Sequence, residues 1–506
     1  MNLNQKIHLN TKGKLDSLFS IIEIGSFSIR LVVYENLSFI PKTLFNEKVI
    51  TNIGNEVSNT GKVSDKSLKL LISQVKRFMK LSLSFTKTTP CILATAAIRN
   101  AENKKRIQQV LQEKTSTKLN ILSEKKEAEL GVQSIQFSYD ITDGLVSDLG
   151  GGSLELSLVR NKKTNFIASL PLGHIFLQEI GTAHSKEVSY HIKKQLNLVQ
   201  GLRNLGIKDL YLIGGNCRAL AKIHMHITKI KHPLIQDYKI QNKDFFNTIE
   251  KKIFVKKSVN EALLRKLSNS RKNTIPYAFK VLKELSKISK IRNIFFTSFG
   301  IREGLIYENI QNKKKVDPFF EQVKKLSQSS ISKKMVKKTH KWILKFLENN
   351  KIKIDPKITL SACMLLNIAR DIHPEIRRIH TIEKIFYYPF SLITRDQRLK
   401  LSLLMYFRHS NGLKDAVAKE MAKKLKSQEV QELLFFGQCL RLCYHITAGI
   451  SDKNLNCCFL KKNGSRLELI VTKKKYLFAS DSINRGLNNA AKSIGLKSSK
   501  IKFQKL

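Results

Sequence analysis

The sequence predicts an α/β protein with a duplicated unit, followed by a mainly helical region that ends in a small α/β piece. Two observations predict the duplicated unit. Apolar strand-like runs alternate with amphipathic helical segments, and one glycine turn occurs twice. The linker ENIQNKKKVDP then precedes the helical region. We expect a flexible basic arm at 1–17, α/β domains at 18–140 and 141–308, the linker at 309–317 and an accessory domain at 318–506.

The first domain begins with LFSIIEIGSFSIRLVVYE, which predicts two strands joined by a small-residue turn. Ser64 then caps an amphipathic helix whose apolar residues recur at helical spacing. Short strands are expected at residues 91–95 and 119–122, with a polar helix between them and another helix from Glu124. This alternation is typical of an α/β domain.

The second domain repeats the first hairpin, because GLVSDLGGGSLELSLVR aligns with it without a gap. The alignment pairs Glu23 with Asp148, Gly25 with Gly150, and Ser28 with Ser153. Each copy thus has an acid at a strand end, then a glycine and a hydroxyl. We expect the two turns to face each other and to hold a phosphate chain between them.

The remaining elements follow from shorter patterns. The predicted order is a strand at 210–213, a glycine turn at 214–215, a helix from Asn216, a long helical stretch to about Ile288 and a strand at 293–297. The accessory domain is expected to be helical to about Ala448. Strands and a final helix follow it in the prediction.

The charge of the chain indicates an anionic partner. Lys and Arg total 90 against 40 Asp and Glu, a formal net charge of +50, which repels itself unless anions are near. A Lys-rich composition of exposed positions is the alternative explanation. The charge alone does not distinguish RNA, a membrane surface and polyphosphate.

The sequence gives no indication of a membrane protein. No apolar run approaches the roughly 18–20 residues that cross a bilayer, and MNLNQKIHLNTKGKLDS has no signal-peptide hydrophobic stretch. We therefore expect a cytoplasmic protein without a membrane partner.

The glycine turns suit a phosphate-rich ligand. Backbone N–H groups approach phosphate closely only where side chains do not block them, which favours Gly150, Gly151 and Gly152. A bare tight turn is the alternative. Asp148 ends an apolar strand, where a carboxylate is costly unless it is solvated, paired or metal-bound. We favour Mg²⁺ bridged to phosphate oxygens as its partner.

Glu127, Arg99 and Glu155 are further candidates for catalysis. Attack on a terminal phosphate needs an oriented water, usually deprotonated by a carboxylate, and Glu127 lies in the first turn of a predicted helix. Arg99 has a guanidinium that matches phosphate oxygens, and Glu155 would support the metal or its water. Each also fits an ordinary role, as a first-turn Glu, a surface Arg and an exposed strand Glu.

These segments together resemble the exopolyphosphatase and guanosine pentaphosphate phosphohydrolase (Ppx/GppA) family. The first phosphate loop is similar to IEIGSFSIRLVVYE, the arginine-bearing strand and loop to ATAAIRNAEN, the catalytic helix to SEKKEAEL and the second phosphate loop to SDLGGGSLEL. Later landmarks follow in the same order: SLPLG, IGGNCRALA, HPL and SFGIREGLIYE.

The resemblance implies a duplicated actin-like ATPase (ribonuclease H-like) fold and a Mg²⁺-assisted phosphohydrolase. Glu127 would activate water, Asp148 and Glu155 would assist metal and water, and Arg99 would hold phosphate. Phosphate binding is implied for Gly25, Ser26, Ser28, Gly150, Gly151, Gly152, Ser153, Gly214, Gly215 and Arg218, and metal binding for Asp148 and Glu23.

This chain also departs from the family pattern. Glu23 stands where the first loop usually has Asp, Phe27 replaces a small polar residue, and Asn216 replaces Thr. The accessory domain resembles metal-dependent HD phosphohydrolases, but Asn367 occupies the apparent Asp position. We therefore expect its histidines to serve structure: His373, His380 and His409. Lining of a substrate channel, or dimerisation, is the expected role of the domain.

Three functions remain open from the sequence. The first is exopolyphosphatase action on inorganic polyphosphate, and the second is 5′-phosphohydrolysis of guanosine pentaphosphate (pppGpp), a stringent-response nucleotide. The third is an inactive regulator that binds a polyanion or RNA, although nucleic acid is the less favoured partner. A homodimer is expected.

Overall fold

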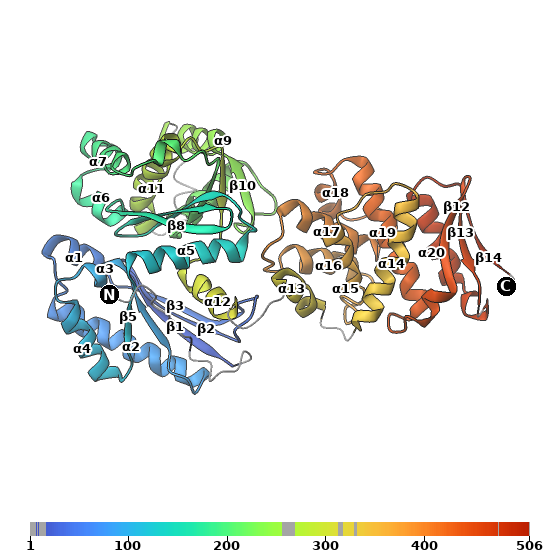
Figure 1. Ribbon diagram of the computed structural model, residues 1–506, viewed down its shortest axis with the longest axis horizontal. Coiled ribbons are helices and arrows are strands. Elements are labelled where there is room, and N and C mark those ends of the chain that lie inside the picture. Colours follow the sequence, from blue (N-terminus) through green and yellow to red (C-terminus); the bar gives the residue numbers. More distant parts are fainter. Residues whose placement is uncertain are drawn as a thin grey trace. The chain divides into compact units, whose positions relative to one another are not determined.

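The computed structural model describes residues 7, 9, 17–255, 269–311, 317–327, 331–473 and 475–504. The chain divides into two compact units, Met1–Lys315 and Val316–Leu506. The first unit contains two mixed sheets with helices around them, and the second is mainly helical (Figure 1). The predicted α/β class with a helical C-terminal region is confirmed.

The first sheet of unit 1 has the strand order β3-β2-β1-β4-β5. Strands β1, β2 and β3 pair antiparallel, whereas β1, β4 and β5 pair parallel. Its strands and helices are β1 (Phe19–Ile24), β2 (Ser28–Tyr34), β3 (Thr43–Ile50), α1 (Ile53–Thr60), α2 (Asp65–Phe85), β4 (Cys91–Ala94), α3 (Ala96–Asn100), α4 (Lys104–Thr115), β5 (Leu119–Ile121) and α5 (Glu124–Ser138). Ser64 caps α2 and Ser123 caps α5, each through its side chain.

The second sheet has the order β10-β11-β9-β6-β7-β8. Without β10 this arrangement repeats the first sheet, including which pairs are parallel, so the duplication extends to the topology. Its elements are β6 (Gly144–Leu149), β7 (Leu154–Arg160), β8 (Lys163–Leu170), α6 (His174–Ile180), α7 (Lys186–Asn197), η1 (Leu202–Asn204), β9 (Asp209–Ile213), α8 (Gly215–Ile227), β10 (Tyr238–Gln241), α9 (Asn242–Ile249), η2 (Glu250–Val255), α11 (Asn269–Ile288) and β11 (Asn293–Phe296).

The long helical stretch expected up to Ile288 is wrong in part. Strand β10 interrupts it and pairs antiparallel with β11 at the sheet edge. The buried ring of Tyr238 in β10 stacks on the ring of Phe296, with their centroids 5.8 Å apart. A four-residue strand with one charged residue has too short an apolar period to separate it from the neighbouring helices.

Helix α5 and the last helix of unit 1, α12 (Ile301–Gln311), pack side by side between the two sheets (Figure 1). Leu130 and Phe137 of α5 share a core cluster with Leu305 of α12 and with residues of β1. The predicted boundary at residue 308 therefore does not match the packing, because α12 follows the second sheet in sequence but packs with the first. It also extends into the predicted linker, whose residues 312–316 lie outside the described part of the chain.

The predicted arm is packed at the two positions that the structure describes. Ile7 and Leu9 are each 6% exposed, and Asn309 of α12 hydrogen-bonds the backbone of both. At these positions the chain is therefore not a free arm. The other residues of 1–16 lie outside the described part.

Unit 2 consists of helices followed by a small three-stranded sheet of order β12-β13-β14. Its elements are α13 (Pro318–Ser327), α14 (Lys333–Asn349), α15 (Pro356–Met364), α16 (Arg377–Phe386), α17 (Arg395–Phe407), α18 (Ala416–Ala422), α19 (Ser427–Thr447), η4 (Lys453–Cys457), β12 (Cys458–Asn463), β13 (Arg466–Val471), η5 (Lys475–Phe478), α20 (Asp481–Ser493) and β14 (Ser498–Phe503). The last element of the described residues is β14, which pairs parallel with β13, so the predicted final helix, α20, is followed by a strand.

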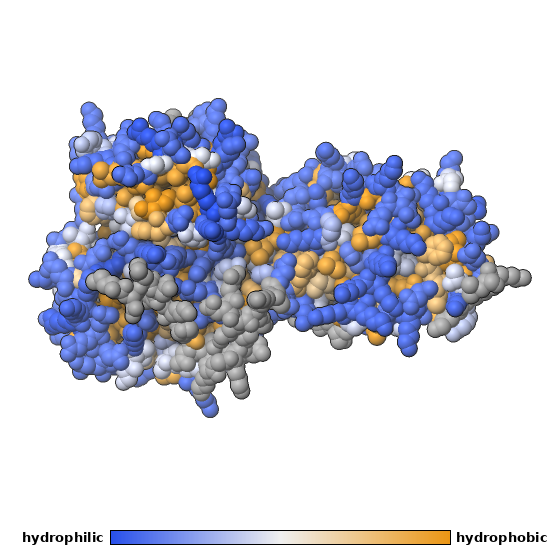
Figure 2. Space-filling model, in the orientation of Figure 1, coloured by the Kyte–Doolittle hydropathy of each residue, from blue (hydrophilic) through white to orange (hydrophobic). Residues whose placement is uncertain are grey.

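The surface reflects the composition. Hydrophilic side chains cover most of the visible face of each unit (Figure 2). Among the described residues, no helix combines the length and the apolar character that a bilayer span requires.

We predict that Gly304→Ala severely destabilises unit 1. A Cβ at this position would lie 1.9 Å from the Leu130 carbonyl oxygen, so α12 and α5 would have to separate. We expect a loss of at least about 2 kcal/mol of unfolding free energy, as overpacked cores show, measured by denaturant unfolding. Gly131→Ala on α5 is the matched control, because its Cβ would meet no described atom nearer than 3.4 Å. Equal stability of the two variants would contradict the packing described here.

Candidate active site

The two glycine turns have the same backbone geometry and face one cleft. Gly25 N–H donates to the Ser28 carbonyl at 2.9 Å, and Gly150 N–H donates to the Ser153 carbonyl at 3.0 Å. The turns approach so closely that a Cβ at Gly151 would lie 3.1 Å from the Ser26 Cβ. Between them is a cavity of about 220 Å³. This is the arrangement that the duplicated motif predicts.

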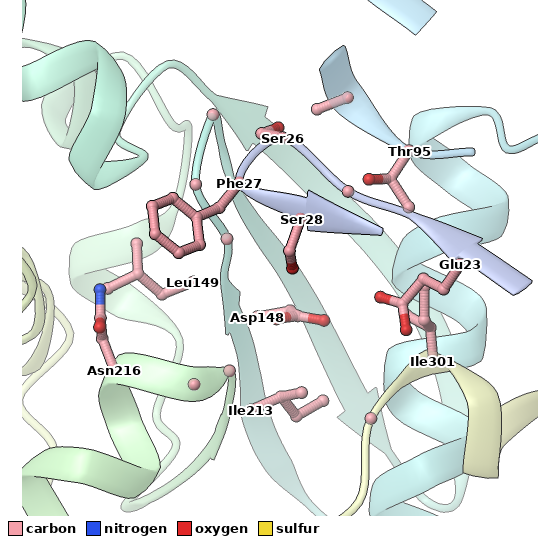
Figure 3. A pocket seen from close by; sticks show the side chains of 18 of the residues that line it. Glu23, Ser26, Phe27, Ser28, Thr95, Asp148, Leu149, Ile213, Asn216 and Ile301 are labelled. Carbon is pink, nitrogen blue, oxygen red and sulfur yellow. The ribbon is translucent and has the colours of Figure 1, made fainter. Parts of the chain in front are cut away.

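Most of the candidate residues line this cleft. Those that do are Glu23, Gly25, Ser26, Ser28, Glu127, Asp148, Gly150, Gly151, Gly152, Ser153, Gly214, Gly215 and Arg218. Figure 3 shows the side chains of Ser28, Asp148 and Glu23 directed into the same space. Arg99 and Glu155 do not line it. Arg99 instead lines an adjoining cavity that shares Ser26 and Gly152 with the cleft.

Two glycines support the turns from behind. A Cβ at Gly173, which precedes α6, would lie 2.2 Å from the Gly151 carbonyl oxygen. Gly214 has φ +113°, a conformation that L side chains rarely adopt, and its Cβ would lie 2.6 Å from the Leu149 carbonyl oxygen. The turns at 150–152 and 214–215 are thus held against each other by backbone contacts.

Asp148 ends β6 at the floor of the cleft. Burial raises the pKa of its carboxyl to about 7, and Glu127 adds to the shift while Arg218 opposes it. Among the described residues, none forms a hydrogen bond or ion pair with the Asp148 carboxylate. Gly131 of α5 lies beside the carboxylate, since a Cβ there would be 3.9 Å from Oδ2. Asp148 is therefore a carboxylate open to a ligand.

Glu127 lies one turn before Gly131 on α5, so the same helix face carries it toward Asp148. It is 9% exposed. Its Oε2 accepts a hydrogen bond from Arg99 Nη1 at 2.5 Å. Burial raises the pKa of Glu127, and the Arg99 contact opposes that shift. The side chain thus combines access to the cleft with a buried carboxylate on whose pKa burial and Arg99 act in opposite directions.

Arg99 lies at the end of α3 and connects two buried acids. Besides Glu127 it binds the Leu122 carbonyl oxygen at 3.1 Å, and its Nη2 is 3.9 Å from Glu155 Oε1. Its Nε and Nη2 are buried and have no hydrogen-bond partner among the described residues. Two donors of Arg99 thus have no hydrogen-bond partner among the described residues while Nη1 holds Glu127.

Glu155 is enclosed behind the second turn. It is 3% exposed and accepts hydrogen bonds from the hydroxyls of Ser153 and Ser169. Burial raises its pKa well above the usual range, with further contributions from Glu127 and Asp148. The register pairs Glu155 with Asp148, as it pairs Arg30 with Glu23 in the first copy.

Cationic side chains in the cleft were largely missed by the sequence analysis. They are Arg30, Lys48, Arg218, Arg271 and Arg302, of which only Arg218 was predicted. Arg302 Nη1 binds Glu23 Oε2 at 2.8 Å, which occupies one proposed metal ligand. Arg302 lies in the IREGL motif, a signal that was available. Arg271 and Lys48 come from elements whose approach to the cleft depends on tertiary packing.

These cations lie close enough together to lower one another's pKa. The pKa of Lys48 is lowered to about 8, first by burial and then by the charges of Arg271 and Arg30. Burial lowers the pKa of Arg271, with Arg218 and Arg30 adding to the shift. Among the described residues, no carboxylate lies within ion-pair distance of these four cations. The cleft therefore carries uncompensated positive charge, which suits a polyanion.

The residues that depart from the family pattern lie at the cleft wall. The ring of Phe27 lies on the side of Leu149 and Asn216 (Figure 3), and Lys48 Nζ lies 4.8 Å from its centroid. Asn216 Oδ1 accepts a hydrogen bond from Arg271 at 2.6 Å, and its Nδ2 is 3.1 Å from His174 Nδ1. His174 Nδ1 is also 3.1 Å from the Gly150 carbonyl oxygen. These contacts connect the turn at 150–152 with Asn216, which follows the turn at 214–215.

Comparisons with known proteins agree with this geometry. Residues 32–313 match the Ppx/GppA phosphatase family, and residues 341–501 match the exopolyphosphatase C-terminal family. The crystal structure of an exopolyphosphatase from Cytophaga hutchinsonii superposes with a TM-score of 0.51 at 18% identity, over 59% of this chain and 99% of that one. That similarity supports the fold.

Similar curated sequences have diverse names. Retrograde regulation protein 2 of Saccharomyces cerevisiae is 23% identical over 326 residues, which cover 58% of this chain and 55% of that protein. Exopolyphosphatase 1 of Mycobacterium tuberculosis is 26% identical over 156 residues, or 30% of this chain and 45% of that protein. The chain spans about half the length of the curated relatives it matches. Because the family match covers more than half of its length and both glycine turns face one cleft, the chain belongs to the Ppx/GppA phosphatase family.

Proposed function

We propose that the chain hydrolyses the terminal phosphoanhydride bond of inorganic polyphosphate and releases orthophosphate. The observation that carries this proposal is the position of Glu127, a buried carboxylate that opens into the cleft between two facing phosphate-type turns. A water in that cleft would lie between a base and the backbone N–H groups that hold the terminal phosphate.

The charge of the cleft supports polyphosphate over pppGpp. Arg30, Lys48 and Arg271 carry positive charge along the cleft without a carboxylate partner among the described residues. A linear chain presents charge to each of them, whereas a nucleoside would leave some facing an uncharged ring. One similar curated protein is named an exopolyphosphatase, which points the same way. A comparison of phosphate release from polyphosphate and from pppGpp separates the two substrates.

In the proposed reaction the turns at Gly25–Ser28 and Gly150–Ser153 hold the terminal phosphoryl group. Glu127 accepts a proton from water, and the water oxygen attacks the terminal phosphorus as the bridging P–O bond breaks. The shortened chain leaves with the bridging oxygen, and orthophosphate is the other product. Arg99 keeps Glu127 ionised before attack and offsets charge near the base. Glu155 orients Ser153 from behind.

The donor set at Asp148 fits a magnesium ion held jointly with substrate. Mg²⁺ is usually bound by one or two carboxylates together with phosphate oxygens and water. Asp148 has a free carboxylate in the cleft, and no cluster of three or more metal-ligating side chains occurs among the described residues. Asp148 would hold the ion, and Glu23 would join it on release from Arg302. The ion would neutralise phosphate charge.

A second candidate function is an inactive regulator that binds polyanions. One observation that favours it is the ion pair between Arg99 and Glu127, which occupies the proposed base. The other is the large ring of Phe27, which lies within the first turn and lines the cleft (Figure 3). Such a protein would bind polyphosphate or RNA through the same cations and release no phosphate.

We predict that Glu127→Gln abolishes turnover but leaves binding nearly unchanged. The amide keeps the shape of the side chain and cannot accept a proton, and loss of a general base typically costs about 10²–10⁴-fold in rate. Phosphate release from polyphosphate gives kcat, and equilibrium binding gives Kd.

Glu124→Gln is the matched control, because Glu124 is an exposed first-turn residue of the same helix. We expect it to retain wild-type kcat. Equal rates for Glu127→Gln and wild type would remove Glu127 from its role. Binding without release by the wild type would establish the second candidate.

We predict that Asp148→Asn stabilises the protein at neutral pH and not in acid. A carboxyl whose pKa is raised to about 7 favours folding while it is protonated, and it loses that contribution as pH rises through 7. With EDTA present, the variant should be more stable than the wild type by about 1–2 kcal/mol at pH 8. At pH 4 the difference should vanish. Denaturant unfolding at both pH values measures it, and an identical difference at both would contradict the burial effect.

A further inference from the structure

Unit 2 contains a group of arginines with no acid among them. Arg408 follows the last residue of α17 and is 6% exposed. Three arginines act on its charge: Arg370 from the loop before α16, Arg377 of α16 and Arg441 of α19. Arg485 of α20 acts in turn on Arg441. We call this group the arginine cluster: Arg370, Arg377, Arg408, His409, Arg441 and Arg485.

Arg408 is held with part of its hydrogen-bonding capacity unused. Its guanidinium carbon lies 4.8 Å from the centroid of the Tyr444 ring, and Nη1 lies 3.1 Å from His409 Nδ1. Its Nε is buried and has no hydrogen-bond partner among the described residues. A buried donor without a partner is costly, so this atom indicates a missing ligand.

The neighbouring arginines leave the charge uncompensated. In the described ranges, no carboxylate lies within ion-pair distance of any arginine of the cluster. Nearby Arg378, in contrast, binds Asp415 at 2.7 Å. The pKa of Arg408 is lowered to about 10, first by burial, with Arg377 and Arg441 contributing to the same shift. His409 adds no charge, because burial and these arginines lower its pKa to about 2.

Structural roles account for only part of the cluster. The C-terminal end of α17 and the Tyr444 ring both favour a cation at Arg408. Arg377 binds the Ile372 carbonyl oxygen at 2.8 Å. Among the described residues, the side chains of Arg441 and Arg370 have no such hydrogen-bond partner, and their charges repel Arg408. A protein that gathers these side chains without an acid gains by binding an anion.

We propose that the arginine cluster is a binding site for a phosphate group, carried either by an inorganic phosphate chain or by a nucleotide. Guanidinium groups match phosphate oxygens with paired N–H donors, and the free Nε of Arg408 supplies one such donor. The cluster lies in unit 2 and does not depend on the function proposed for unit 1.

The site lies beside the position that resembles a metal site in HD phosphohydrolases. A Cβ at Gly449 would meet both Asn367 Oδ1, at 2.5 Å, and the Tyr444 ring, at 3.0 Å. Asn367 is thus next to the ring that Arg408 covers. Arginines at this place repel a metal ion and attract an anion.

Hydrogen exchange of the full chain, measured by mass spectrometry, tests the proposal. The Glu127→Gln protein is used so that no chain is consumed, with orthophosphate, tripolyphosphate or guanosine triphosphate added in turn. We expect protection of backbone amides in 404–410 and 437–447 with at least one of these ligands. Comparing tripolyphosphate with guanosine triphosphate shows whether the phosphate group is carried by an inorganic chain or by a nucleotide. Peptides from the cleft, at 22–28 and 148–154, report the proposed function separately.

In the Glu127→Gln protein, adding Arg441→Gln should raise the ligand concentration needed for half-maximal protection at least tenfold. Arg370→Gln is a second variant, at an exposed position. Arg466→Gln is the matched control, because it removes one exposed charge from β13 of the same unit and should change nothing. Melting temperatures check that each variant is folded. Protection confined to the cleft peptides, or equal protection in Arg441→Gln and Arg466→Gln, would overturn the proposal.

Discussion

The position of helix α5 between the two sheets is the constraint on which the cleft depends. Its backbone contacts α12 so closely at Leu130 that only glycine fits at residue 304. One turn of the same helix carries Glu127, and the next brings Gly131 beside Asp148. A helix clamped in this way fixes the separation of Glu127, the proposed base, from Asp148 of the second sheet. The geometry of the proposed site is thus set by helix packing outside the cleft.

Some charged side chains of the cleft form ion pairs and others do not. Glu127 and Glu23 are each neutralised by an arginine, whereas Asp148 and the cations Arg30, Lys48 and Arg271 are not. Stability would be greater if these charges were removed or paired. Their retention in a cavity between two phosphate-type turns is typical of a site whose missing charges belong to the ligand.

The sequence could predict what is encoded by local pattern. The duplicated turns follow from spacing alone, and the caps at Ser64 and Ser123 follow from residue type. The sequence could not place Arg99, because its contact with Glu127 joins elements 28 residues apart. It likewise missed Arg271 and Lys48, which reach the cleft through tertiary packing, and β10, whose four residues carry no period. Metal binding by Glu23 and Asp148 stays a prediction.

The turns share a backbone but not their side chains. Where the first copy has Phe27 and Arg30, the second has Gly152 and Glu155 at the matching positions. At these positions the two copies thus differ in chemistry: the first copy has an aromatic ring and a cation, and the second has a glycine and an acid. Substitutions at Phe27 or Arg30 would therefore change the shape and the charge of the cleft while the turn that follows Asp148 keeps its own residues.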